Sequence, residues 1–190
     1  MALPAPKISV REYLAGEELT DIRHEFADGE VFEMEAATLN HQRVLMNLAG
    51  ELRNRLAQTG CSILPNPRTA TAENGMYTYP DLVVVCGRIE TWPINKNTIA
   101  NPRIIIEVLS PSTEGYDRGK KFDLYCAFPS FVEYLTVAQH SPWILQHTLH
   151  EDGEWRQRRI TGLEAVLRLS CVPVEIPLVE IYRDVQFDTA

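Results

Sequence analysis

Two carboxylates stand in apolar stretches of the chain, where a charge without a partner is costly. Asp81 follows Pro80 and opens the apolar run of residues 82–85, and Glu107 interrupts the aliphatic run of residues 104–109. An ionised carboxylate in a buried strand needs an ion pair or a metal ion. Taken singly, Asp81 could simply open a strand, and Glu107 could belong to a buried ion pair. On neighbouring strands the two could share one Mg²⁺, which prefers hard oxygen ligands.

A lysine lies on the helix expected after the second of these strands. Asp117, Lys121 and Tyr125 are four residues apart and therefore share one helical face. Alone, this pattern is typical of a surface ion pair beside a packed tyrosine. A short loop separates this helix from the strand of Glu107, so the lysine could also reach the carboxylates. There an ammonium group could orient an attacking water molecule and offset charge on a phosphoryl group.

The remaining polar candidates have simpler explanations. Glu25 could be an accessory metal ligand, but an exposed position on a strand is the simpler interpretation. His41 lies on a leucine-rich helical face, where a hydrogen-bonded core histidine is commoner than a catalytic base. Arg156, Arg158 and Arg159 could touch a nucleic-acid backbone, or could lie on the solvated face of a strand. The sequence contains no glycine-rich phosphate loop, Walker motif or G-x-S-x-G motif.

The elements that must position these residues follow from the spacing of apolar residues. We expect a short helix over residues 9–19, a hairpin over 22–35 that turns at Asp28-Gly29, and an amphipathic helix over 38–58. A third helix is expected over 117–128. The expected strands cover residues 61–64, 68–72, 82–86, 104–109, 131–137, 143–149 and 155–160. This order predicts an α/β fold with a mixed β-sheet flanked by helices, and residues 1–190 form a single expected domain.

Composition narrows the class of protein. The chain has 190 residues, 45% of them hydrophobic and 23% charged, which is typical of a globular protein. Its net charge of −8 argues against a protein that coats nucleic acid through many Lys and Arg contacts. The same charge is compatible with a metal-dependent nuclease, because bound cations reverse the sign of the local field.

The cysteines and the apolar runs bear on the compartment. The chain has four cysteines, Cys61, Cys86, Cys126 and Cys171, and no two have a metal-binding spacing. We expect all four to be buried free thiols. There is no apolar stretch long enough to span a membrane and no signal peptide at the start of the sequence. Together these features predict a cytoplasmic protein.

Three segments of the sequence carry a resemblance to a known family. The segments YPDLVVVCG, RIIIEVLSPSTEGYDRGKKFDLY and FVEYLTV resemble the Uma2 (DUF820) family, which is placed in the PD-(D/E)XK nuclease superfamily. The resemblance extends over nearly the whole chain. In it, Pro80-Asp81 matches the P-D motif and Glu107 the second acid. The lysine of the usual (D/E)-x-K would stand at Leu109, and Lys121 on the following helix matches the lysine instead.

The resemblance implies a restriction-endonuclease-like fold and a Mg²⁺- or Mn²⁺-dependent endonuclease. Asp81, Glu107 and Lys121 would be its catalytic residues. The metal ligands would be Asp81, Glu107 and the backbone carbonyl of Val108, and Glu25, His41, Asp117 and Tyr125 are possible accessory residues. The expected partner is nucleic acid, with DNA favoured over RNA, and a homodimer is expected because nucleases that cut two strands commonly act as dimers.

Two other functions remain open from the sequence. The chain could be a degenerate member of the fold that binds nucleic acid or a protein without cutting. It could also be a metal hydrolase of a small phosphate ester, since a fold by itself does not fix the substrate. A Mg²⁺ titration separates the binding module from both enzymes, because a pure binding module has no need for a metal at Asp81.

Overall fold

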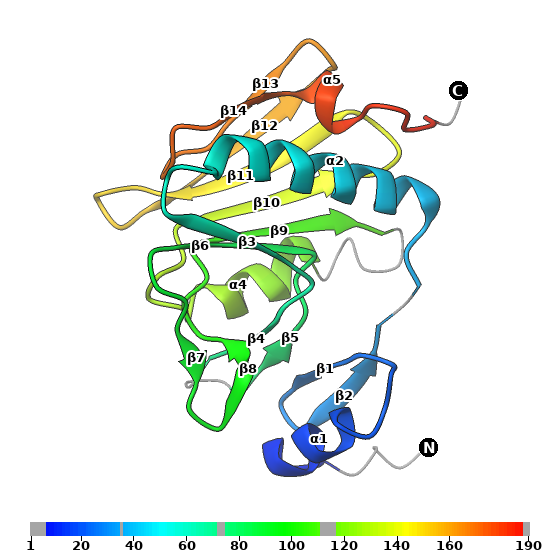
Figure 1. The fold of residues 1–190 in the computed structure, drawn as a ribbon, viewed down its shortest axis with the longest axis vertical. Coiled ribbons are helices and arrows are strands. Elements are labelled where there is room, and N and C mark those ends of the chain that lie inside the picture. Colours follow the sequence, from blue (N-terminus) through cyan, green and yellow to red (C-terminus); the bar gives the residue numbers. More distant parts are fainter. Residues whose placement is uncertain (1–6, 35, 72–74, 111–116, 188–190) are drawn as a thin grey trace.

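The computed structural model describes residues 7–34, 36–71, 75–110 and 117–187, with the side chains of residues 117 and 118 left out. It is a mixed α/β fold built on two six-stranded sheets and one two-stranded sheet (Figure 1). The mixed α/β class predicted from the sequence is confirmed, although a single sheet was expected. None of the described helices is long and apolar enough to cross a membrane.

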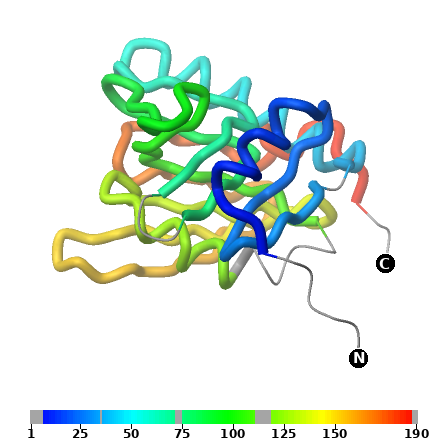
Figure 2. The backbone as a smooth tube through the Cα atoms, turned by 90° about the horizontal axis from the view of Figure 1, so that it is seen from below, coloured from blue at the N-terminus to red at the C-terminus, as the bar shows by residue number. Residues whose placement is uncertain are grey.

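The larger core is built on the sheet with the order β12-β11-β10-β9-β6-β3. Its β9 and β10 are parallel, and the other pairs in this sheet are antiparallel. The strands of this sheet are β3 (Cys61–Pro65), β6 (Leu82–Cys86), β9 (Ile104–Leu109), β10 (Glu133–Ala138), β11 (Trp143–Leu149) and β12 (Trp155–Thr161). In Figures 1 and 2 the tip of the β11–β12 hairpin projects from the body of the molecule.

Each face of this sheet has its own apolar core because successive strand residues point to opposite sides. Ile104 and Ile106 of β9 pack with the long helix α2 (Leu39–Leu56), whose buried side chains include Leu48 and Leu52. Ile105 packs on the other side with aromatic residues of α4 (Phe122–Tyr125) and the segment after it. Sheet and helices therefore form three layers (Figure 1).

The second six-stranded sheet has the order β2-β1-β5-β4-β8-β7 and lies below the first in Figure 1. Its strands are β1 (His24–Ala27), β2 (Glu30–Glu33), β4 (Arg68–Ala70), β5 (Tyr77–Thr78), β7 (Thr91–Trp92) and β8 (Asn95–Ile99). The chain passes from one sheet to the other at Asn66, which has a positive φ of 44° between β3 and β4. Asparagine tolerates this left-handed conformation better than most residues, so it can redirect the chain here.

The other elements are short. Helix α1 (Val10–Glu17) has a capping box in which Ser9 and Glu12 bond each other's backbone N–H groups. The expected helix over 117–128 is a π-helical turn, η1 (Asp117–Lys121), followed by α4. The strands β13 (Val166–Arg168) and β14 (Glu175–Pro177) form the third sheet, and α5 (Leu178–Ile181) follows them.

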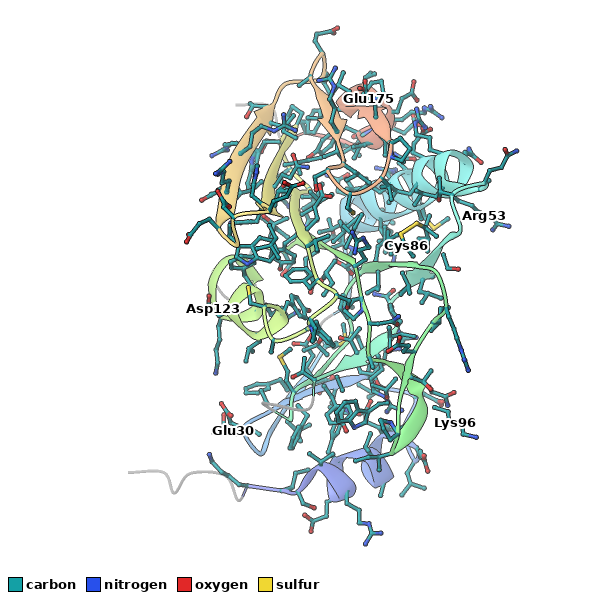
Figure 3. The ribbon with its side chains drawn as sticks, turned by 90° about the vertical axis from the view of Figure 1, so that its left-hand side faces the viewer. Glu30, Arg53, Cys86, Lys96, Asp123 and Glu175 are labelled. Atoms are coloured by element: carbon teal, nitrogen blue, oxygen red, sulfur yellow. A yellow bond between two sulfur atoms is a disulfide. The ribbon has the colours of Figure 1, made fainter. Side chains whose placement is uncertain are left out.

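The prediction of four buried free thiols is wrong. Cys61 and Cys86 form a disulfide, which Figure 3 shows as a yellow bond beside the label of Cys86. The antiparallel register of β3 and β6 places these two residues directly opposite each other, and that pairing spans 25 positions of sequence. Cys126 is free and exposed, and Cys171 is free and half-buried. With this disulfide present, only Cys126 and Cys171 remain as the free thiols on which the expected cytoplasmic location rested.

Candidate active site

The register of β6 and β9 brings the two predicted carboxylates together. Leu82 is paired with Ile106, so Asp81, just before β6, lies beside Glu107 near the end of β9. The backbone N–H of Asp81 donates to Glu107 Oε2 at 3.1 Å. Both residues are buried, with 9% and 4% of their surface exposed. Two carboxylates that were 26 positions apart in the sequence therefore share one buried site.

Backbone and side-chain donors hold the carboxylate of Asp81. Its Oδ2 accepts the backbone N–H of Val108 at 2.8 Å and lies 3.1 Å from His41 Nε2. Its Oδ1 accepts a longer bond of 3.4 Å from the side chain of Asn66. The N–H and C=O of a residue in an extended strand point to the same side, so the carbonyl of Val108 also faces Asp81.

Lys121 completes the cluster from the face of the sheet opposite α2, the helix of His41. Its Nζ lies 3.2 Å from Glu107 Oε1 and 2.9 Å from Glu25 Oε1. The contact with Glu107 is a hydrogen bond, whereas the contact with Glu25 has the distance of an ion pair without the angle of a hydrogen bond. The lysine is 6% exposed and ends the π-helical turn η1, a type of distortion that is frequent at functional sites.

The chain also matches a known protein family. A model of the Uma2 family, described as "Putative restriction endonuclease", matches residues 10–179. The chain belongs to the Uma2 family.

Relatives and a solved structure extend this result. The Uma2 chain is 34% identical to "Uncharacterized protein slr1290" of Synechocystis sp. (strain ATCC 27184 / PCC 6803 / Kazusa) over 187 residues, which cover 97% of this chain and 96% of the relative. It is 29% identical to "Uncharacterized protein sll1609" of the same organism over 168 residues, covering 88% and 95%.

The fold is also similar to that of a solved structure described as a "putative nuclease belonging to DUF820 from Anabaena variabilis ATCC 29413". The TM-score is 0.74 at 15% sequence identity, and the match covers 92% of the Uma2 chain and 97% of the other. The similarity supports the restriction-endonuclease-like fold.

Tyr125 binds the same carboxylate oxygen as Lys121. Its hydroxyl donates to Glu107 Oε1 at 2.8 Å and lies 3.4 Å from Thr78 Oγ1. Burial raises the pKa of Tyr125 well above its ordinary value, and the neighbouring charge of Glu107 raises it further. The phenol therefore stays protonated and acts as a hydrogen-bond donor to the carboxylate.

The positions of the accessory candidates in the Uma2 structure agree with the expectation to different degrees. Glu25 was expected on an exposed strand and is instead 8% exposed, because β1 turns it inward towards Lys121. His41 is buried and hydrogen-bonded, as expected for a core histidine, but its partner is the carboxylate of Asp81. The side chain of Asp117 lies outside the described part of the chain.

Two site residues were missed because their contacts depend on the tertiary fold. Asn66 donates its backbone N–H to the carbonyl of Asp81 at 2.9 Å, in addition to its side-chain bond to the carboxylate. Gln139, just after β10, donates to the carbonyl of Leu109 at 2.7 Å and accepts a bond from Thr38, the N-cap of α2. Gln139 thus ties the end of β9 to the helix that carries His41. Nothing in the local sequence marked either residue.

The charges of the cluster suit a divalent cation. With Glu25, Asp81 and Glu107 each at −1 and Lys121 at +1, the formal sum is −2 with His41 neutral. An excess of buried negative charge is costly unless a cation compensates it. Within the described ranges, no group of three or more His, Cys, Asp or Glu side chains has the arrangement of a metal site. Two carboxylates and a carbonyl still fit Mg²⁺, which is usually held by one or two carboxylates and keeps several waters.

Proposed function

We propose that this Uma2 protein is a divalent-metal-dependent endonuclease that hydrolyses phosphodiester bonds of nucleic acid, with DNA as the first substrate to test. The observation that carries the proposal is the meeting of Asp81, Glu107 and Lys121 in one buried cluster. Their roles as catalytic residues, and those of Glu25, His41 and Tyr125 as accessory residues, are part of the proposal.

The proposed metal ligands are Asp81, Glu107 and the backbone carbonyl of Val108. The negative formal charge of the cluster and its oxygen donors support Mg²⁺ or Mn²⁺ as the ion. A bound metal of this kind lowers the pKa of its water and polarises the phosphoryl oxygens.

The residues of the chain would act around the reacting phosphate. Lys121, held between Glu25 and Glu107, would position the attacking water and offset the charge that develops on the phosphoryl oxygens. His41 and the N–H of Val108 would keep the carboxylate of Asp81 in one orientation. In the reaction the water oxygen would bond to phosphorus and release a proton to solvent, the bond from phosphorus to the leaving sugar oxygen would break, and that oxygen would take up a proton from solvent.

The decisive experiment is a cleavage assay on labelled single-stranded and double-stranded DNA and RNA. Wild-type protein is incubated with Mg²⁺, with Mn²⁺ and with chelator, beside the variants Asp81→Asn and Lys121→Met. Asp123→Asn is the matched control, because Asp123 is exposed on α4, the helix that follows Lys121. We expect metal-dependent cleavage that falls by orders of magnitude in the first two variants and is unchanged in the control. Equal cleavage by wild type and both site variants would refute the assignment.

A binding module without catalysis is the second candidate. It is favoured by the ion pairs of Lys121, which already has two carboxylate partners, and the net charge of −8 favours a protein over nucleic acid as the partner of such a module. Calorimetric titration with Mg²⁺ distinguishes the two. Binding that is lost in Asp81→Asn supports the enzyme, and no binding by the wild type supports the module.

The nuclease proposal includes a homodimer, since two symmetric copies can each cut one strand of a duplex. Phe128 and Phe131 are only 3% and 2% exposed and belong to the core, so neither is available to an interface between the copies. Sedimentation equilibrium with and without DNA tests the dimer directly.

A further inference from the structure

The three arginines of β12 do not share one environment. In the strand register, Glu107 of β9 lies opposite Thr136, Thr136 opposite Leu145, and Leu145 opposite Arg159. Directly paired residues point to the same face of a sheet. Arg159 therefore stands on the face of the sheet that carries the carboxylate of Glu107.

The other two arginines stand on the opposite face and have partners there. Arg158 donates to Gln146 Oε1 at 2.7 Å, and Gln146 lies on the α2 side, where it also bonds the buried Glu133. Arg156 pairs with Asp152 in the turn before β12. Both side chains are thus engaged away from the face of the candidate active site.

Arg159 is held by an aromatic ring rather than by an acid. Its guanidinium carbon lies 4.4 Å from the centre of the ring of Trp143. Among the residues that the structure describes, no hydrogen bond or ion pair reaches Arg159, and its side chain is exposed. Stacking on a ring fixes the plane of a guanidinium and leaves its N–H donors at the edge available. The N–H donors of Arg159 are therefore oriented and available to bind a planar or tetrahedral anion.

The distance to the candidate active site suits a polymer. Three strand spacings separate Glu107 from Arg159, which is about 14 Å. One strand of a duplex rises about 3.4 Å per nucleotide, so the gap corresponds to a few nucleotides. Thr136 and Leu145 are buried, with 0% and 5% exposure, so the row sets the distance but is not itself the contact surface.

We propose that Arg159, stacked on Trp143, binds a backbone phosphate of the substrate strand a few nucleotides from the bond that is cut. The inference rests on the proposed nuclease function and adds a binding contact to it. Charge complementarity supports it, because in a chain with a net charge of −8 this exposed cation faces the same way as the candidate active site and has no acidic partner in the described part of the chain.

The test compares two arginines of one strand. Binding of a labelled DNA duplex is measured by fluorescence anisotropy at several NaCl concentrations, with Lys121→Met as the slowly cleaving background and Mg²⁺ present. Adding Arg159→Gln should weaken binding roughly tenfold, as expected for a charge-assisted hydrogen bond. It should also reduce the slope of log affinity against log salt by about one phosphate contact. Arg156→Gln, on the opposite face, should change the affinity by no more than about twofold and should leave the salt slope unchanged.

The outcomes separate the two proposals. If wild-type protein cleaves nucleic acid but Arg159→Gln binds like Arg156→Gln, the phosphate contact is refuted and the nuclease function stands. If wild-type protein neither binds nor cleaves any of the four polymers, both proposals fail. A loss in Arg159→Gln that Arg159→Lys restores only in part would support the stacked guanidinium specifically, because lysine keeps the charge but not the planar donors.

Discussion

Replacing Tyr125 by Phe isolates one hydrogen bond of the candidate active site. The substitution removes only the hydroxyl that donates to Glu107 Oε1 at 2.8 Å. The ring stays, and so do its contacts with Phe131 and Tyr134, whose centroids lie 6.0 and 5.7 Å away. Any change in stability therefore comes from the hydroxyl and not from a cavity.

The size of the effect follows from the environment of this bond. A hydrogen bond to a charged group contributes about 1.5–3 kcal/mol, and Tyr125 is fully buried. Glu107 Oε1 keeps Lys121 as a second partner, so we expect the lower part of this range, about 1.5–2 kcal/mol. For a chain of this size each kcal/mol shifts the melting temperature by about 2–4 °C, which predicts a decrease of roughly 3–8 °C.

Thermal unfolding followed by circular dichroism in chelator measures this decrease, with Asp123→Asn as the exposed control on the same helix. In the cleavage assay, Tyr125→Phe should raise the Mg²⁺ concentration needed for half-maximal rate more than it lowers the rate at saturating Mg²⁺, because the hydroxyl orients Glu107, a proposed metal ligand. A melting temperature equal to that of the wild type would show that the hydroxyl does not bond a buried carboxylate, and would refute the reasoning.

Two further predictions concern groups away from the site. Under non-reducing conditions in denaturant, iodoacetamide should label Cys126 and Cys171 only, and reduction should add Cys61 and Cys86; mass spectrometry that finds four labelled cysteines without reduction would contradict the disulfide. Burial raises the pKa of Tyr182 above its ordinary value of 10.0, so the folded state holds this proton more tightly than the unfolded state. The resulting stabilisation is complete below about pH 10 and is lost as pH rises above it. Tyr182→Phe should therefore show a shallower decline in unfolding free energy between about pH 10 and 12 in urea titrations, and an unchanged slope would contradict this assignment.

Local patterning was sufficient for the strands that carry the site. The bounds of β6, β9 and β11 agree with the expected segments, because each is a run of apolar or alternating residues with a clear stop. The hairpin at Asp28-Gly29 was predicted from its turn residues, and both have a positive φ in the structure. Long elements with a strong sequence pattern could therefore be predicted from the sequence.

Three strands of the second sheet, β5, β7 and β8, were not predicted, because they are short or polar. β5 and β7 have two residues each, which is too short for any periodicity, and β8 has the polar sequence NKNTI. Such segments become strands only through partners elsewhere in the chain, such as the parallel pairing of β4 with β8. The inward position of Glu25 and the Cys61–Cys86 disulfide depend on the same kind of non-local pairing.

Glu133 shows the limit of the signal that identified Glu107. It is also an acid within an apolar strand, and it is fully buried. Its carboxylate accepts bonds from the side chain of Gln146 and from the backbone and hydroxyl of Ser170, at 2.9 and 2.8 Å for the latter two. These neutral donors attach a loop to the sheet, and within the described residues no lysine contacts this carboxylate. Sequence pattern finds buried acids, and only their partners separate a structural acid from a candidate catalytic one.

The backbone N–H bonds that the Asp81 and Glu107 side chains accept across the two strands have a consequence for how such a protein can change in evolution. Backbone pairing of β6 with β9 is assigned only as far as Leu82 and Ile106. Beyond that point the side chain of each acid takes a backbone N–H of the opposite strand, Glu107 from Asp81 and Asp81 from Val108. The two acids thus serve as the last rungs of the ladder. A relative without the proposed activity would still need both acids to complete this strand pairing, so their presence in a relative reflects architecture as well as any chemistry.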